Sequence, residues 1–366
     1  MTIRAKLLTP HRWLGLAFAI LLFVQGCTGV VVAFRDELNQ ALHHAALTVV
    51  PATAKVPVQA LADRVRAAHP QLRLERIEYP EHVDAALVFR MQAADGGDLR
   101  FVAVNPHTGA ITRDEPVSGW PVQWLYKVHQ QLLAGDTGHI IVGISAIALL
   151  FFAITGLWMW WPGRRHLRRG LTVSFSNGAY RGFRDAHRVG GALAGSVLFM
   201  SACTGIVLVW FSSFQSFAGM FGAVARKPSA SVVERSGASL LPIDAVIERA
   251  RERFGDAPIK SVRFPGLHGR VVSVYFVDVG NSRPRATNQI MLNGYSGETL
   301  HTYEAAKAPA ANRTLDWVLP VHTGEFLGFP GRILLLLAAV ALQALAITGL
   351  LQWWQRRQRR RTVTGQ

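Results

Sequence analysis

The chain has 366 residues, of which half are hydrophobic and only 17% are charged, yet its formal net charge is +16. Such a composition excludes a disordered chain and argues against an ordinary soluble enzyme, because apolar and basic residues must occupy different segments. The basic residues are not gathered on one soluble domain, so we expect no nucleic-acid partner.

Four stretches of about 22 residues contain no Asp, Glu, Lys or Arg: Trp13–Phe34, Ile140–Trp161, Val189–Phe211 and Ile333–Trp354. As a helix, each stretch extends over about 33 Å, which is enough to cross the hydrocarbon core of a bilayer. The sequence therefore predicts four transmembrane helices embedded in a lipid bilayer.

Most of the net charge lies in three short segments, residues 1–12, 162–188 and 355–366. Together these segments carry 15 Lys and Arg but a single acidic residue, Asp185. The two long connections, 35–138 and 212–331, carry 23 basic and 22 acidic residues. By the positive-inside rule, we expect the short segments and both termini in the cytoplasm and the long connections on the opposite side.

The chain also contains an internal duplication. His11–Leu38 matches His187–Phe214 at an offset of 176, with His-Arg, Gly and Cys-Thr-Gly in common. The segment from Val128 matches the segment from Val321 at an offset of 193, with Val-His, Ile-Thr-Gly-Leu and Trp-Trp in common. The pattern indicates two copies of a unit made of helix, extramembrane domain and helix.

Each long connection is predicted to form an α+β domain. A polar helix opens each one, Pro57–His69 in the first and Pro242–Phe254 in the second. Segments of alternating hydrophobicity follow as predicted strands: Leu72–Tyr79, Ala86–Gln92, Leu99–Asn105, Ile259–Phe264, Val271–Asp278 and Asn288–Asn293. The residues expected to form the two cores are Leu61, Val65, Ile77, Val88, Phe101 and Val104, and Val246, Ile247, Val262, Val274 and Phe276.

Four of the thirteen histidines are matched by the duplication. His11 and His187 form the inner pair, at the cytoplasmic ends of the first and third membrane helices. His129 and His322 form the outer pair, just before the second and fourth. Two imidazoles per layer suit the two axial positions of haem iron, whose macrocycle supplies four nitrogens, whereas zinc takes four ligands. We therefore predict bis-histidine haem at each pair; another metal, or simple packing or a proton relay, are the alternatives.

Other polar residues of the membrane helices are open to two interpretations. A Thr-Gly pair lies in every membrane helix: Thr28-Gly29, Thr155-Gly156, Thr204-Gly205 and Thr348-Gly349. These pairs are typical of close helix packing, and they would also leave room for a flat macrocycle. Arg12 and Arg188 could pair with haem propionates or simply mark the cytoplasmic side. His139 is matched by Arg332, so symmetry does not support it as a ligand, and we expect it at the membrane interface.

Several of these motifs resemble the PepSY-associated transmembrane family of bacterial inner-membrane proteins, which includes siderophore-iron reductases. The motifs are His11 to Gly15 (HRWLG), Val128-His129, the Gly156–Pro162 end of the second helix and Val321–Gly324. The resemblance covers essentially the whole chain. It implies four membrane helices, two periplasmic PepSY-like domains, and two b-type haems held by His11, His187, His129 and His322.

The expected fold is thus an α-helical membrane protein with four transmembrane helices from a two-fold duplication and two periplasmic α+β PepSY-like domains. The predicted segments are 1–38, 126–162, 187–214 and 318–355 for the helices, 39–125 and 215–317 for the domains, 163–186 for a cytoplasmic loop and 356–366 for a basic tail.

The function that these features suggest is an inner-membrane di-haem reductase. It would pass electrons from quinol or a cytoplasmic reductase to a periplasmic Fe(III)-siderophore or other ferric chelate. The competing hypothesis is a non-redox PepSY protein with a binding, regulatory or peptidase-inhibiting role, in which the histidines are structural.

Overall fold

The computed structural model describes residues 3–80, 82–94, 96–97, 99–176, 178–225, 232–233, 238–264, 270–280, 283 and 286–364. The chain divides into two compact units, which are described separately. The helical unit comprises Met1–Arg35, Leu125–Phe214 and Trp317–Gln366. The sheet unit comprises Asp36–Trp124 and Gln215–Asp316.

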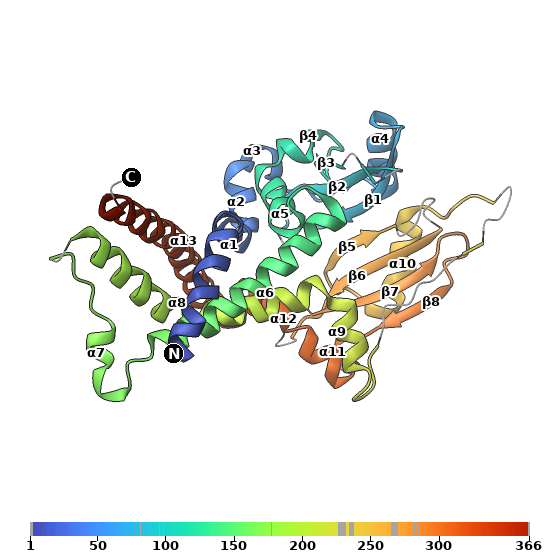
Figure 1. Ribbon diagram of the computed structural model, residues 1–366. Helices are drawn as coiled ribbons and strands as arrows, with labels where there is room; N and C mark the ends of the chain where they lie inside the picture. The colour runs from blue at the N-terminus through green and yellow to red at the C-terminus, as the bar shows by residue number, and fades with distance from the viewer. Residues whose placement is uncertain are drawn as a thin grey trace. The chain divides into compact units, whose positions relative to one another are not determined.

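Four long helices form the helical unit: α1 (Ile3–Ala33), α6 (Gly135–Trp160), α8 (Ala179–Val209) and α13 (Gly328–Thr364) (Figure 1). Each is long and apolar enough to cross a membrane, which confirms the predicted four membrane helices. Each packs against two neighbours, so that the order around the bundle is α1, α6, α8, α13.

The packing of the bundle suits an apolar solvent. Small and branched residues fill its centre, among them Leu22, Ala194 and Ala338. Large apolar residues also point outward, since Ile20 is 76% exposed and Leu193 is 69% exposed. Helices that are apolar on every side are typical of membrane spans.

Two short helices precede the second and fourth membrane helices, α5 (Pro121–Gln131) and α12 (Val318–Thr323). The sequence analysis did not predict them as separate elements. The remaining short helices are α2 (Arg35–Leu42), α3 (His44–Leu47), α7 (Leu167–Gly170), α9 (Phe211–Ala218) and α11 (Ala310–Leu315), with 3-10 turns η1 (Val117–Gly119), η2 (Arg164–His166), η3 (Ala305–Lys307) and η4 (Glu325–Leu327).

The sheet unit contains one antiparallel sheet of eight strands in the order β4-β3-β2-β1-β5-β6-β7-β8. The first half has β1 (Leu72–Glu78), β2 (Leu87–Ala93), β3 (Leu99–Val104) and β4 (Ile111–Pro116). The second half has β5 (Ile259–Arg263), β6 (Val271–Val277), β7 (Thr287–Asn293) and β8 (Thr299–Tyr303). The helices α4 (Val58–Ala68) and α10 (Ile243–Phe254) pack on β1 and on β6 and β7, respectively. The six predicted strands and both predicted helices are present, and none of their ends is shifted by more than one residue.

The two halves meet at β1 and β5. Ile77 lies opposite Val262 in this pairing, and both side chains are fully buried. Two separate α+β domains were predicted, but the two connections form one continuous sheet with one shared core. The physical reason is that β1 and β5 would each be an open edge strand in a separate domain. When they pair, the backbone N–H and C=O groups of one strand bond to those of the other.

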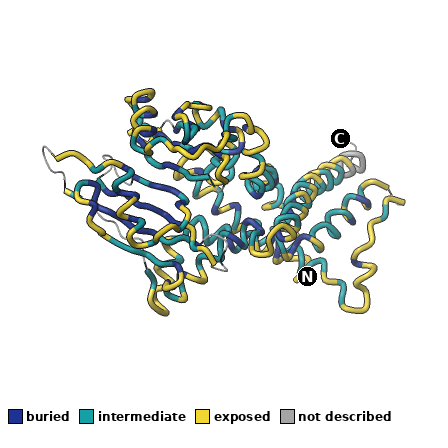
Figure 2. Tube along the Cα trace, turned by 180° about the vertical axis from the view of Figure 1, so that it is seen from behind, coloured by how far each residue is buried: buried dark blue, intermediate teal, exposed yellow. Residues whose placement is uncertain are grey.

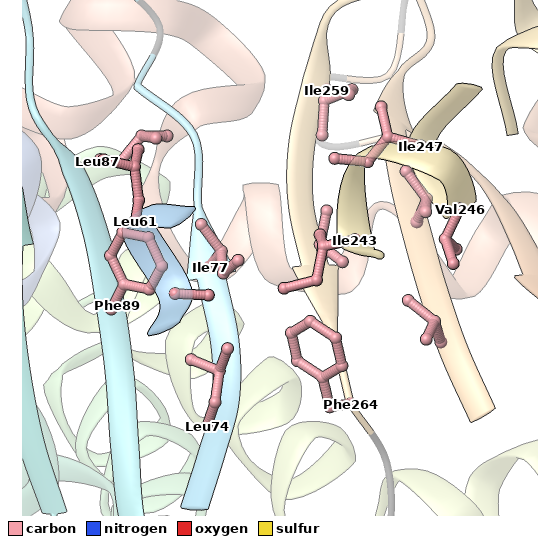
Figure 3. Packing of buried hydrophobic residues seen from close by; sticks show 14 of the residues in the cluster. Leu61, Leu74, Ile77, Leu87, Phe89, Ile243, Val246, Ile247, Ile259 and Phe264 are labelled. Atoms are coloured by element: carbon pink, nitrogen blue, oxygen red, sulfur yellow. The ribbon is translucent and has the colours of Figure 1, made fainter. Parts of the chain in front are cut away.

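The shared core lies between the sheet and its two helices (Figure 3). Its side chains come from both halves, with Phe89 and Leu61 on one side and Val246 and Ile259 on the other. Figure 2 shows long buried stretches along the strands, and β6 is buried from Val271 to Phe276.

Two of the predicted core residues occupy a different cluster. Phe101 packs on the opposite face of the sheet with Trp120, and Val88 lies against the same cluster. Strand alternation explains this placement, because Val88 lies between Leu87 and Phe89, which point into the main core.

Candidate functional site

The inner pair of histidines lies on the first and third membrane helices. His11 on α1 places its Nδ1 2.7 Å from the hydroxyl oxygen of Thr155 on α6. His187 on α8 places its Nδ1 3.0 Å from the hydroxyl oxygen of Thr348 on α13. Each inner histidine therefore reaches across to a neighbouring helix and makes the same contact there.

The outer pair lies on the short helices α5 and α12. His129 Nδ1 is 3.0 Å from the hydroxyl oxygen of Thr28 on α1, and His322 Nδ1 is 2.9 Å from that of Thr204 on α8. The two imidazole rings are neighbours, with centroids 6.3 Å apart and planes tilted by 50°. Thus the structure brings together the two outer histidines that the sequence analysis paired.

Tight backbone turns bring the outer histidines into this position. After α5 the chain reverses through Leu132 and Leu133, which have positive φ values of 50° and 58°. After α12 it turns at Gly324, which has φ 79°. A left-handed conformation is uncommon for leucine, and strained backbone of this kind tends to occur at functional sites.

A glycine follows each of the four threonines, and each glycine faces the same imidazole as its threonine. A Cβ atom at Gly29 would lie 3.3 Å from Cε1 of His129, and one at Gly205 would lie 3.3 Å from Cε1 of His322. In the inner pair the corresponding distances are 3.8 Å at Gly156 and 3.6 Å at Gly349. Each Thr-Gly pair therefore forms a seat for one histidine, with the hydroxyl on Nδ1 and the glycine leaving room for the ring.

This role of the Thr-Gly pairs was missed by the sequence analysis, which considered helix packing and room for a macrocycle. The sequence did contain a signal for this role: each of the four membrane helices has one Thr-Gly pair, and there are four paired histidines.

The sequence of the chain from residue 8 to residue 356 matches the family model described as PepSY-associated TM region. The chain belongs to this family. The match includes all four histidines and all four Thr-Gly pairs, and it agrees with the resemblance seen in the sequence motifs. A comparison with curated proteins found no match.

The donor set of this PepSY-associated membrane protein fits haem better than a bare metal ion. No group of three or more His, Cys, Asp or Glu side chains that could hold a metal lies within the described part of the chain. Two imidazoles that share one iron at about 2 Å have centroids about 6 Å apart, since about 1 Å separates Nε2 from the ring centre. The 6.3 Å separation of the His129 and His322 rings matches this geometry.

Other predicted residues have partners of their own. The ring nitrogens of His139 lie 3.2 Å from the carbonyl oxygen of Gln130 and 3.1 Å from that of Val209. Arg188 donates to the carbonyl oxygen of Thr172 at 3.0 Å and lies 3.5 Å from Asp185. His139 therefore contacts two backbone carbonyls, and Arg188 is already engaged by protein groups.

Histidines of the sheet unit make local contacts. His69 Nε2 lies 2.8 Å from a carboxylate oxygen of Asp114, and His43 packs edge-on against Trp120. These two histidines therefore serve local hydrogen bonding and packing within the sheet unit.

Proposed function

We propose that this protein is a di-haem membrane reductase that delivers electrons to a ferric siderophore or another Fe(III) chelate. The observation that carries the proposal is the proximity of His129 and His322, whose ring separation of 6.3 Å suits two axial ligands of one iron. When bound, haem b supplies reversible one-electron transfer at its iron.

The pairing of the ligands follows from distances along α1. Seventeen residues separate His11 from Thr28, which seats His129. These positions are thus about 25 Å apart along the helix, whereas two nitrogens on one iron lie about 4 Å apart. His11 and His129 therefore belong to different haems. The proposal holds one haem between His11 and His187 and the other between His129 and His322.

The two-fold arrangement reflects an internal duplication. His11 and His187 lie 176 positions apart in the sequence, and Thr28 and Thr204 lie the same number of positions apart. Each copy contributes one histidine and one Thr-Gly seat to each layer. The apolar bundle around them excludes water, and its histidines hold the ligand positions at two depths.

The direction of electron flow in this proposal follows from charge. In this proposal the helices cross a bacterial inner membrane. The basic termini and the loop at 163–186 lie in the cytoplasm, and the sheet unit lies in the periplasm. Quinol or a cytoplasmic reductase supplies the electrons on the inner side. Reduction of the iron in an external chelate weakens its binding to hard oxygen ligands and releases Fe(II).

An absorption spectrum of the purified protein, before and after reduction, tests the cofactor. We expect sharp low-spin haem bands and two haems per chain. His187→Ala should alter the inner haem and His322→Ala the outer haem, and both should abolish ferric reduction by membrane vesicles. The matched control is His44→Ala, since His44 is exposed and hydrogen-bonds only locally to Thr48. A colourless parent protein would support the non-redox PepSY hypothesis instead, and one haem per chain would contradict the pairing.

A reporter fusion tests the topology. Alkaline phosphatase joined after Thr53 should be active, because Thr53 lies in the sheet unit. The same enzyme joined after Arg165 should be inactive. Activity in the opposite pattern would reverse the proposed orientation.

A further inference from the structure

The threonine of each Thr-Gly seat is itself hydrogen-bonded to its own helix. Thr28 Oγ1 lies 2.8 Å from the carbonyl oxygen of Val24, and Thr204 Oγ1 lies 2.8 Å from that of Met200. The inner seats repeat the geometry, with 2.7 Å from Thr155 to Phe151 and 2.6 Å from Thr348 to Ala344. In every case the acceptor is the carbonyl four residues earlier in the helix.

This contact fixes the direction of the bond to histidine. A hydroxyl group has one hydrogen to donate, and here it points to the helix carbonyl. The threonine oxygen is then free to accept the hydrogen on Nδ1 of the imidazole. A neutral imidazole that carries its hydrogen on Nδ1 has its lone pair on Nε2, which is the atom that can bind a metal.

We propose that Thr28, Thr155, Thr204 and Thr348 are positioning residues that hold the four histidines in the tautomer able to ligate haem iron. This inference rests on the proposed di-haem function. Each threonine accepts the Nδ1 hydrogen, sets the direction of Nε2 and increases the electron donation of the imidazole. Groups that bind the second nitrogen of a metal-ligating histidine commonly have this effect.

The glycines define how tightly each ring is held. In the outer pair a Cβ atom at Gly29 would come within 3.3 Å of the ring of His129, so the imidazole would have to move. In the inner pair the corresponding distance at Gly156 is 3.8 Å, an ordinary van der Waals contact. The outer seats therefore restrict rotation of the ring more than the inner seats do.

The decisive substitution is Thr28→Val, which keeps the shape of the side chain but removes the hydroxyl. We expect the outer haem to be retained about 10- to 100-fold less tightly, as for other partners of metal-ligating histidines. The midpoint potential of that haem should rise, because a less electron-rich imidazole stabilises Fe(III) less. The inner haem should not change. Thr28→Ser should restore both properties, since serine keeps the acceptor oxygen.

The matched control is Ser145→Ala. Ser145 is buried on α6 and donates to the carbonyl oxygen of Val142, one turn earlier in the same helix, at 2.7 Å. Loss of its hydroxyl should leave both potentials unchanged. A second test uses the outer glycine: Gly29→Ala should perturb the outer haem spectrum, because its Cβ atom would lie 3.3 Å from Cε1 of His129.

A readout without haem separates this inference from the proposed function. In haem-free protein labelled with ¹⁵N-histidine, the spectrum should show His129 protonated on Nδ1, and Thr28→Val should shift this signal. If the parent protein never binds haem, the proposed function fails and the proposed positioning role of the threonines fails with it. If the parent binds two haems but Thr28→Val has the parent's potential, affinity and ¹⁵N signal, the positioning role alone is wrong.

Discussion

Arg332 donates two hydrogen bonds from its guanidinium group to the carbonyl oxygen of Ala33, at 3.0 and 2.7 Å. His139 makes the corresponding contact to the carbonyl oxygen of Val209 at 3.1 Å. The sequence offsets match His139 with Arg332 and Ala33 with Val209. Each side chain therefore contacts the carboxyl end of a neighbouring membrane helix, α1 for Arg332 and α8 for His139. A hydrogen-bond donor or a cation is favourable at that end of a helix.

This equivalence predicts that arginine can replace His139. His139→Arg should keep the melting temperature of the detergent-solubilised protein, because arginine holds the same position in the other half. His139→Leu should lower the free energy of unfolding by about 1 kcal/mol, since a helix-end contact is lost. Equal losses in the two variants, measured by thermal unfolding, would mean that the contact to Val209 does not stabilise α8.

Helices α4 and α10 of the sheet unit cap one another. The carboxylate of Asp244 on α10 accepts hydrogen bonds from the backbone N–H groups of Val58 and Gln59, both at 2.8 Å. The side chain of Gln59 in turn accepts from the backbone N–H of Ile243 at 2.9 Å. Both helices begin after a proline, which has no side-chain group for capping. The partner helix supplies the missing acceptor.

Asp244→Ala should therefore destabilise the sheet unit by about 1–2 kcal/mol, the usual range for the loss of an N-terminal cap. Chemical denaturation followed by circular dichroism of the full-length protein measures this effect. Glu248→Ala is the control, because Glu248 is exposed on the same helix. If the two variants unfold at the same denaturant concentration, the reciprocal caps contribute nothing.

The shared core predicts a large effect at Phe276. Its side chain is fully buried and its ring lies 5.1 Å from that of Phe254. Phe276→Ala should lower the free energy of unfolding by about 3–5 kcal/mol, because it leaves a cavity under the sheet. Val279→Ala should have little effect, since Val279 is 73% exposed. A small loss at Phe276, measured in the same denaturation assay, would show that the core relaxes around the cavity.

Local pattern was sufficient for the membrane helices and for most strands, because each depends on residues close in sequence. It failed for β4 and β8, which lie at the edges of the sheet. Ile111 at the start of β4 is exposed, and charged residues follow it, so the strand has no apolar face of its own. Its position depends on backbone pairing with β3, which a local pattern does not reveal.

The rest of the fold and of the candidate site depends on contacts between residues far apart in the sequence, which a local pattern cannot predict. The pairing of Ile77 with Val262 joins residues far apart in the chain, so two domains were expected where one sheet exists. In the candidate site, the duplication was enough to select His129 and His322. It could not show that the Thr28 hydroxyl lies 3.0 Å from Nδ1 of His129, because that contact depends on the turn between α5 and α6.

The last prediction concerns acid stability and the carboxylate of Asp114 on β4. Burial raises the pKa of this group, but hydrogen bonds from Arg100 at 2.5 Å and His69 at 2.8 Å outweigh burial and hold the pKa below its ordinary value. A carboxyl group with a lowered pKa in the folded protein stabilises the fold above its unfolded pKa. That contribution is lost as the pH falls through the folded pKa.

Stability should therefore decrease between about pH 5 and pH 3 more steeply in the parent than in Asp114→Asn, which has no charge to lose. Thermal unfolding of the solubilised protein at both pH values measures the difference, with Asp256→Asn, a fully exposed carboxylate, as the control. Parallel pH profiles for the parent and Asp114→Asn would show that the contacts with Arg100 and His69 do not contribute to folding.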